Sequence, residues 1–366
     1  MEEKDSNKIQ ARRKLIEQSG VISEFGEEAF KISLAQITNV SDSEIIGGHW
    51  SFFAFKNPTS FAIGTSGNGM KVIENSKLIH SVPFPTGVLA DLLDIIYIEQ
   101  LDCYLLNYND NIYRKDIDDK PPYLYMDINS NWRVRKFFRY SKVNQRLFVI
   151  SSAKLKVINL LRKQVEIEIR INREESEFVD FRLLGLKEKK LFYLTVKGNI
   201  KMCSLSYDLK KICTRTNFKI QPFEGRREIW RYITVCDKSK YLFVHSSEQY
   251  SSKSSRMMVL EVKERSLVPL AEINEFQLNT RLKSTLGFWR YIGEHILWAA
   301  PNKLEGSIHI YDFNTESGEL KELTDEKRVK HEEFYVYKLS RLEDRLYYAG
   351  NRGEIMELSL VSGVQI

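Results

Sequence analysis

The chain has 366 residues, and 43% of them are hydrophobic, so it is long and apolar enough to bury a large core. Its 55 basic and 49 acidic residues give a formal charge of +6, which favours a mixed solvated surface over a dedicated nucleic-acid-binding face. No apolar run approaches the ~18 residues of a membrane-spanning helix, and the polar segment Met1–Asp5 has no signal-peptide core.

The first predicted element is a short basic helix over Asp5–Gly20. Asp5 can cap its start and Gly20 can end it, and its apolar residues form only a thin stripe. We interpret residues 1–28 as an N-terminal surface helix or disordered arm, and a dedicated docking element is the alternative.

A strand is predicted next, over Ala29–Ile37, where apolar and polar residues alternate. After it, a unit with an apolar triplet and further strand-like runs is repeated seven times, with 43 to 54 residues between successive triplets. The triplets begin at Phe61, Tyr104, Leu147, Leu191, Leu242, Ile296 and Leu346. A period of this length with four strands per unit is typical of a β-propeller. We therefore predict an all-β, seven-bladed β-propeller over residues 29–366.

We number the four strands of each unit from the central axis outward, so that the apolar triplet is the second strand. Only six of the seven units contain their own fourth strand. The seventh ends with a third strand over Glu354–Leu360, which would leave an exposed sheet edge. We expect the strand over Ala29–Ile37 to occupy that edge and to join the beginning of the propeller to its end.

One segment resembles a known family. Ile308–Gly318 is similar to the end of a WD repeat, with Tyr311-Asp312 in place of Trp-Asp. The chain thus resembles a seven-bladed propeller of the WD-repeat-like superfamily over residues 29–360. Apart from a weaker echo at Tyr207-Asp208, the dipeptide does not recur, so the family's Asp–His hydrogen-bond tetrad is not transferred to this chain.

Five long connections of the predicted propeller leave one face of blades four to seven. They are Lys219–Glu228, Ser246–Arg256, Gln277–Gly287, Pro301–Gly306 and Asp325–Phe334. Repeat proteins gather insertions on the face that binds partners, so we predict a partner-binding site here. The candidate contact residues are Arg226, Arg227, Tyr250, Lys253, Arg256, Arg281, Lys283 and Arg328. Ordinary drift in loop length is the alternative explanation.

In four consecutive repeats, an arginine directly follows an aromatic residue in the first strand. These inner-strand arginines are Arg139, Arg182, Arg231 and Arg290. Strict alternation would place Trp230 and Tyr232 on one face of their strand and Arg231 on the other. We expect such arginines to stack on aromatic rings and to bind carbonyls or carboxylates. The alternative is a cationic lining that binds an acidic peptide, a phosphate or a nucleotide.

Catalytic and metal-binding motifs are missing from the sequence. The six histidines lie in separate repeats, and the four cysteines have no C-x-x-C spacing. We predict a non-catalytic protein without metal or cofactor, whose buried thiols stay reduced in the cytoplasm or the nucleus. Its expected role is a scaffold for other protein subunits. An RNA- or nucleotide-associated subunit is the main alternative, and a propeller enzyme with carboxylates such as Asp94 at its axial mouth is the second.

Overall fold

The computed structural model describes the strands and many of the short turns between them. The described residues are 21–25, 28–39, 51–65, 69–75, 77–82, 92–108, 111–118, 120–127, 137–142, 144–150, 154–170, 178–184, 190–195, 197–205, 212–221, 228–235, 240–248, 255–276, 287–292, 294–302, 307–322, 329–330, 340–342, 345–349 and 354–363. The helix predicted over Asp5–Gly20 lies outside them.

The regular structure of the described residues is almost entirely β. The exception is a single 3-10 turn, η2, over Glu99–Leu101. Seven antiparallel sheets are formed, and the chain divides into two compact units, residues 1–82 with 282–366 and residues 83–281. Over the described residues, no helix is long and apolar enough to cross a membrane.

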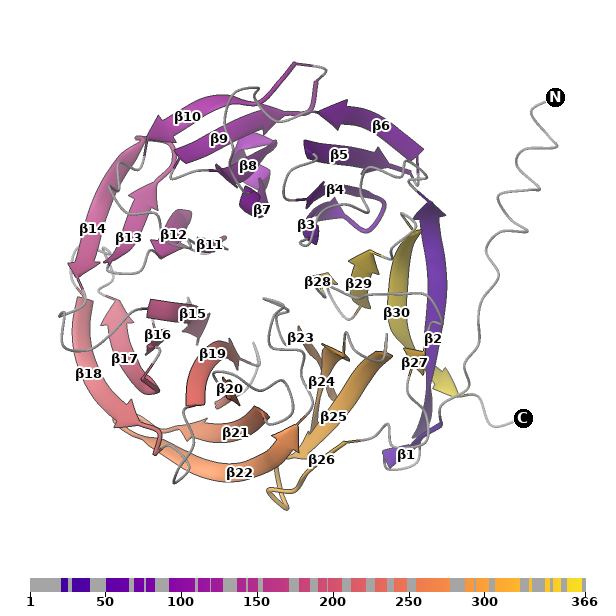
Figure 1. Ribbon diagram of the computed structural model, residues 1–366, viewed down its shortest axis with the longest axis vertical. Helices are drawn as coiled ribbons and strands as arrows, with labels where there is room; N and C mark the ends of the chain where they lie inside the picture. The colour runs from indigo at the N-terminus through magenta and orange to yellow at the C-terminus, as the bar shows by residue number, and fades with distance from the viewer. Residues whose placement is uncertain are drawn as a thin grey trace. The chain divides into compact units, whose positions relative to one another are not determined.

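The unit of residues 83–281 contains four sheets of four strands each, and the strands of a sheet pair in chain order (Figure 1). The first two sheets contain β7 (Leu92–Ile98), β8 (Cys103–Tyr108), β9 (Asn111–Asp116) and β10 (Tyr123–Asp127), then β11 (Phe137–Ser141), β12 (Arg146–Ile150), β13 (Lys154–Asn159) and β14 (Gln164–Arg170). The next two contain β15 (Phe178–Leu184), β16 (Lys190–Thr195), β17 (Asn199–Leu205) and β18 (Ile212–Lys219), then β19 (Glu228–Val235), β20 (Tyr241–Glu248), β21 (Ser255–Val262) and β22 (Leu267–Phe276). Contacts between β7 and β11, β11 and β15, and β15 and β19 bring the first strands together, so the fourth strands form the outer edges.

The unit of residues 1–82 and 282–366 contains three sheets. The first has β3 (Ser51–Asn57), β4 (Ser60–Thr65), β5 (Gly69–Glu74) and β6 (Lys77–Val82). The second has β23 (Gly287–Ile292), β24 (His295–Asn302), β25 (Ser307–Asn314), β26 (Leu320–Glu322) and β27 (Val329–Lys330). The third has the order β1 (Val21–Phe25), β2 (Glu28–Asn39), β30 (Glu354–Gly363), β29 (Arg345–Ala349) and β28 (Ser340–Leu342).

The third sheet joins strands from the beginning and the end of the sequence. β2 pairs antiparallel with β30, with Leu34 opposite Leu358 and Ser33 opposite Ser359. This confirms that the strand predicted over Ala29–Ile37 pairs with the seventh third strand. The additional strand β1 was not predicted. It pairs outside β2 and lies in the segment interpreted from the sequence as a surface helix or disordered arm.

The sequence located most strands well, and β7 and β15 have the predicted bounds. One correction concerns the predicted connection Asp325–Phe334, because it contains β27. The three-residue strand β26 pairs only with Tyr311–Phe313 of β25, and β27 pairs with Ser307 and Ile308 at the other end of β25. This segment therefore continues the sheet, since it supplies backbone partners that the short β26 does not reach.

A β-bulge recurs at the same place in the fourth strand of five sheets. In each of these sheets, one residue of the fourth strand has no partner opposite it on the third strand. These residues are Ile79, Tyr125, Glu166, Arg215 and Leu270, one in each of five successive sheets. A bulge bends its strand, re-aims a side chain and makes a sheet edge less able to pair with another chain. The repeat therefore specifies a bent, protected outer strand that the hydrophobic pattern does not reveal.

The hydrophobic core lies between neighbouring sheets. Ile98, Leu105 and Ile112 of one sheet are in a single buried cluster with Leu147 and Val149 of the next. Another cluster joins the sheets of β15–β18 and β19–β22 in the same way. Each buried side chain of this kind contributes about 1.5–3 kcal/mol relative to exposure, so packing against the next sheet stabilises each repeat.

Candidate functional site

Most residues of the predicted partner-binding site lie outside the described residues. They are Arg226, Arg227, Tyr250, Lys253, Arg281, Lys283 and Arg328. Their role as partner contacts stays a prediction.

Arg256 is the described member of that set, and it is buried. It belongs to β21, and its residue is only 6% exposed. Its Nε lies 2.9 Å from Oε1 of Glu272 on β22, and its Nη1 donates a hydrogen bond of 3.0 Å to the carbonyl oxygen of Gln221. Because the guanidinium connects elements of the protein itself, we assign Arg256 to the stabilisation of this region and not to partner contact.

Of the inner-strand arginines, Arg139 has a described side chain. Its Nη1 lies 3.6 Å from Oδ2 of Asp94, which is on β7 of the neighbouring sheet and 4% exposed. Oδ1 of the same carboxylate accepts a hydrogen bond of 3.0 Å from the N–H of Ile95. This pairing agrees with the structural interpretation of the arginine series, in which a buried carboxylate holds the arginine.

The other three arginines are described at the level of the backbone. Arg182 lies on β15, Arg231 on β19 and Arg290 on β23. The register of β19 and β20 shifts between Trp230 and Tyr232. The strict alternation assumed from the sequence is therefore interrupted at Arg231, because a bulge changes which residues oppose each other.

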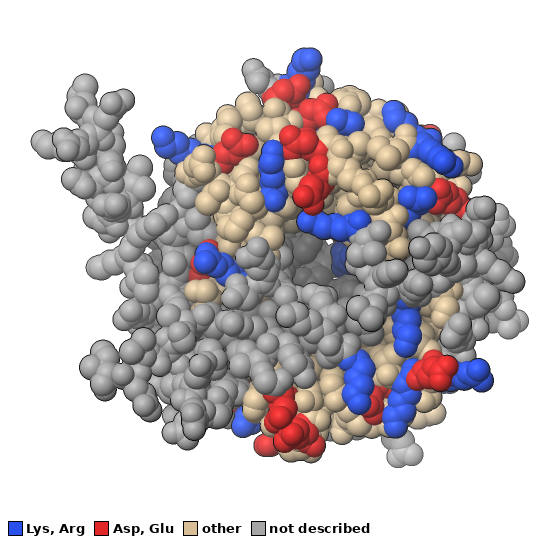
Figure 2. Space-filling model, turned by 180° about the vertical axis from the view of Figure 1, so that it is seen from behind, with Lys and Arg blue, Asp and Glu red and all other residues tan. Residues whose placement is uncertain are grey.

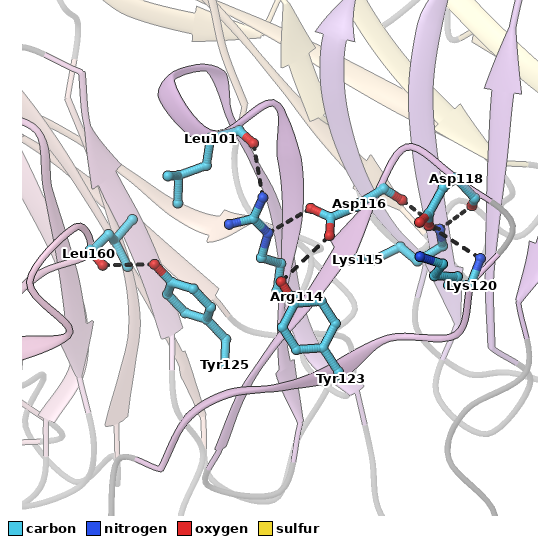
Figure 3. A network of polar contacts seen from close by, with 9 residues as sticks. All are labelled: Leu101, Arg114, Lys115, Asp116, Asp118, Lys120, Tyr123, Tyr125 and Leu160. Carbon is cyan, nitrogen blue, oxygen red and sulfur yellow. Dashed lines mark hydrogen bonds and ion pairs between the residues drawn. The ribbon is translucent and has the colours of Figure 1, made fainter.

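A polar network that was not predicted surrounds Lys115, on the third strand β9 (Figure 3). The Lys115 residue is fully buried, and its Nζ donates hydrogen bonds to the carbonyl oxygens of Asp116 and Asp118. Oδ1 of Asp118 is 3.1 Å from the same nitrogen, and this bond keeps the pKa of Asp118 below its usual value. One buried cation thus binds three oxygens and fixes the turn after β9.

Arg114, next to Lys115 on β9, and Tyr125, on β10, continue this network. Arg114 Nε lies 2.6 Å from Oδ1 of Asp116, and its guanidinium carbon is 5.8 Å from the centre of the Tyr125 ring. The Tyr125 hydroxyl donates a hydrogen bond of 2.8 Å to the carbonyl oxygen of Leu160, in the next sheet (Figure 3). Tyr125 is also the skipped residue of the β10 bulge, so the bulge directs a side chain across the boundary between two sheets.

A second network centres on Glu166, which is the skipped residue of β14. Arg146 donates two hydrogen bonds to its carboxylate, of 2.5 Å from Nε and 3.1 Å from Nη2. Asn159 Nδ2 donates a third, of 3.0 Å. Burial alone would raise the pKa of Glu166, but these hydrogen bonds outweigh it and hold the pKa below the ordinary value.

The Glu166 network predicts a pH-dependent contribution to stability. Because the folded-state pKa is depressed, the contribution is complete above the ordinary glutamate pKa of about 4.3 and disappears as the pH falls through the folded value. We expect Arg146→Met to lower the free energy of unfolding by about 1 to 3 kcal/mol at neutral pH. Urea unfolding over a pH series measures this, and the two proteins should converge on acidification. An equal difference at every pH would contradict the assignment.

Comparison with known sequences gives no match. No protein-family model matches the chain, and no curated protein matches it either.

Comparison with solved structures gives strong matches at low sequence identity. The Nup133 β-propeller domain of Vanderwaltozyma polyspora is 10% identical, with a TM-score of 0.63 over 94% of this chain and 100% of that one. The Pan2 WD40 domain of Neurospora crassa is 13% identical, with a TM-score of 0.59 over 91% and 96%. Virginiamycin B lyase of Staphylococcus aureus is 12% identical, with a TM-score of 0.60 over 91% and 100%. The chain has a β-propeller fold.

Thiol and metal chemistry has little support in the described part of this propeller. Cys103 and Cys203 are buried free thiols, as predicted, and burial raises the pKa of Cys103 to about 12, so this thiol stays protonated at neutral pH. His245 is 1% exposed, whereas His295 Nδ1 lies 2.9 Å from Oδ2 of Asp312. Among the described residues, no group of three or more His, Cys, Asp or Glu side chains could hold a metal ion.

Charges on the propeller are mixed in sign. Figure 2 shows basic and acidic side chains interspersed over the described part of one face. Several pair directly, as Lys154 does with Glu168 at 3.0 Å and Lys142 with Glu99 at 3.2 Å. A nucleic-acid-binding face is normally a dense basic surface, so this part of the propeller does not have that character.

The sequence missed the networks around Lys115 and Glu166. Both depend on side chains that meet across strands or within a turn, and both lie beside a bulge that the hydrophobic pattern does not reveal. The run Lys115-Asp116-Ile117-Asp118 offered a signal, because a lysine in a buried strand position with two nearby carboxylates requires an internal partner.

Proposed function

We propose that this β-propeller is a non-catalytic scaffold that binds other proteins through the loop-rich face of blades four to seven. The connections between second and third strands, and those between successive sheets, leave the same end of each antiparallel sheet. The five long connections predicted for blades four to seven are of these two kinds, although the last of them also contains β27. Long loops at one end of rigid sheets suit recognition, since they add contact surface at a low entropic cost.

One contact supports this proposal most directly. The hydrogen bond between Arg256 Nη1 and the Gln221 carbonyl oxygen joins the start of one long connection to the end of another. The connection Lys219–Glu228 and the connection Ser246–Arg256 therefore meet at these residues, and together they can offer one continuous surface. The buried Arg256 would then be a support beneath the loops, while Tyr250, Lys253 and their neighbours stay the proposed contacts.

The fold alone does not choose between functions, because propellers support many unrelated activities. The compared structures themselves include a WD40 domain and a lyase. What favours a protein scaffold is the mixed charge of the described surface and the internal use of its buried ionisable groups, as at Lys115 and Glu166. An RNA- or nucleotide-associated subunit is the alternative, and it would use the inner-strand and loop arginines.

A loop replacement tests the proposal. Residues 249–254, between β20 and β21, are replaced with Asn-Gly, which suits a two-residue hairpin turn. We expect affinity purification of the tagged full chain to lose at least one protein that wild type recovers in stoichiometric amount, after nuclease treatment and in 0.3 M salt. The control is Glu264→Ser, in the turn at the other end of the same sheet, and it should retain that protein.

Two results would contradict the proposal. If the loop variant and wild type recover the same proteins, the loop between β20 and β21 is not a contact. If recovery depends on nucleic acid and falls steeply with salt, the RNA-associated alternative is favoured, because phosphate contacts weaken strongly as ionic strength rises.

A further inference from the structure

Large hydrophobic side chains are exposed on the outer strands and on the turns that lead into them. Leu161, in the turn before β14, is 65% exposed, and Tyr123 and Leu124 on β10 are 47% and 52% exposed. Single exposed apolar residues are common. Leu161 differs because a fixed turn holds it directly before two exposed cations, Arg162 and Lys163.

The turn that carries Leu161 is held by its own hydrogen bonds. The N–H of Arg162 donates to Asn159 Oδ1 at 3.1 Å, and the N–H of Lys163 donates to the Leu160 carbonyl oxygen at 3.3 Å. Lys163 adopts a φ of 51°, in the left-handed region that a non-glycine residue enters at a cost. These contacts fix the backbone on both sides of Leu161, so little entropy is lost when a partner binds there.

Tyr125 connects this turn to the neighbouring sheet. Its hydroxyl donates to the same Leu160 carbonyl, and Lys163 Nζ lies 4.4 Å from the centre of its ring. Tyr123 lies two residues earlier on β10 and exposes about half of its surface. The hydroxyl of Tyr123 is directed to Asp116, at 3.5 Å, so we define the Leu161 patch as Leu161, Arg162 and Lys163, a turn that Tyr125 connects to the neighbouring sheet of the unit of residues 83–281.

The charge of this patch is positive. Arg162 and Lys163 are both exposed, and among the described residues neither has an ion pair within 4 Å; Arg162 acts on the Glu166 carboxylate only at longer range, and Lys163 Nζ lies over the Tyr125 ring. The nearest carboxylate of the sheet, Glu166, already accepts two hydrogen bonds from Arg146 and one from Asn159. Asp116 is paired with Arg114 in the same way. Two solvent-exposed cations without a close carboxylate partner thus follow the exposed Leu161 side chain.

We propose that the Leu161 patch binds an acidic segment of a partner protein that carries a bulky apolar side chain. The apolar side chain would pack on Leu161, while an aspartate or glutamate would pair with Arg162 or Lys163. Paired apolar and opposite-charge contacts of this kind give both affinity and orientation. The proposal rests on the protein-binding role proposed above and adds a second surface, on a turn between a third and a fourth strand and in a different sheet from the long loops.

A peptide selection on the full chain tests this. The probe is a phage-displayed library of random 12-residue peptides, selected against wild type and then against Leu161→Ser. We expect the wild-type selection to enrich peptides with Asp or Glu within three positions of Leu, Ile or Phe. Binding of the best peptide should weaken at least tenfold in Leu161→Ser and in the double variant Arg162→Glu, Lys163→Glu. Exchanging the peptide's acidic residues for lysine should restore binding to the double variant.

A matched control comes from the fourth sheet of the same unit. Leu270 on β22 is 42% exposed, and Arg265 lies in the turn before that strand. Leu270→Ser with Arg265→Glu makes a similar change in hydrophobicity and charge and should leave peptide binding unchanged. The substituted patch side chains are exposed, so the melting temperature should stay within about 2 °C of wild type, because surface changes usually cost under 0.5 kcal/mol.

Several outcomes would overturn the proposal. They are failure to enrich any sequence, enrichment of peptides without acidic residues, and equal binding by the patch variants. Binding of a 12-nucleotide RNA that requires the same residues, or self-association abolished by Leu161→Ser, would assign the patch to a different occupant. The chain with residues 249–254 replaced should still bind the peptide, so failure of the loop proposal and failure of this one are distinguishable.

Discussion

A disulfide between positions 33 and 359 is expected to form readily and to stabilise the protein strongly. Ser33 on β2 lies directly opposite Ser359 on β30, which places their Cα atoms at a separation that a disulfide can span. The bond would close a loop of roughly 300 residues, for which the chain-entropy model gives about 5 to 6 kcal/mol. We expect Ser33→Cys with Ser359→Cys to cross-link under mild oxidation and to shift urea unfolding to higher concentration.

Reduction and register provide the controls for this prediction. Dithiothreitol should return the midpoint of unfolding to the wild-type value. The pair Ser33→Cys with Ser362→Cys is out of register, because Ser362 lies opposite Phe30, and it should not cross-link. Equal cross-linking of the two pairs, or none in the matched pair, would show that β2 and β30 do not pair as described. Such a result would also contradict the sheet that joins strands from the beginning and the end of the sequence.

Removal of the buried amine of Lys115 is expected to destabilise the protein severely. Lys115→Met keeps most of the side-chain volume but removes the donor to two carbonyl oxygens and to the Asp118 carboxylate. Leaving buried acceptors without their donor is strongly unfavourable, so the free energy of unfolding should fall by about 2 to 4 kcal/mol. Chemical denaturation followed by tryptophan fluorescence measures the change.

The comparison for Lys115 lies five residues further along the chain. Lys120 is exposed, and Lys120→Met should change the free energy of unfolding by no more than about 0.5 kcal/mol. Asp118→Asn weakens one of the three acceptors and should give a smaller loss than Lys115→Met. If Lys115→Met is as stable as Lys120→Met, the amine does not hold the turn after β9, and the network in Figure 3 has no structural role.

The two proposed surfaces lie on different sheets and use different kinds of connection. The long loops follow second and fourth strands, whereas the Leu161 patch lies at the turn between the third strand β13 and the fourth strand β14. A propeller with both surfaces would hold two partners at once without movement of its sheets, because each blade is stabilised by its neighbours and not by the loops.

The sequence by itself determined the repeat and the fold class. Each apolar triplet lies in a second strand, and its described side chains are buried, because a continuous apolar run is buried where sheets cover both faces of a strand. The alternating segment at Ala29–Ile37 identified the strand that pairs with β30, because a sheet edge left open at the end of the chain requires a partner. These features depend on local pattern and on counting strands.

Tertiary structure alone decided which polar side chains meet. The bulges at Tyr125 and Glu166 each shift the register of the fourth strand by one residue. The spacing of hydrophobic residues in the sequence does not reveal such a shift. The bulges bring Tyr125 to Leu160 and Glu166 to Arg146, residues that are distant along the chain. Arg256 is a further example. Its position at the end of a serine-rich loop favoured an exposed side chain, but the folded protein buries it beside Glu272. Sequence pattern specifies where apolar surface is buried, but the partner of a buried charge depends on strand register, which only the folded sheets determine.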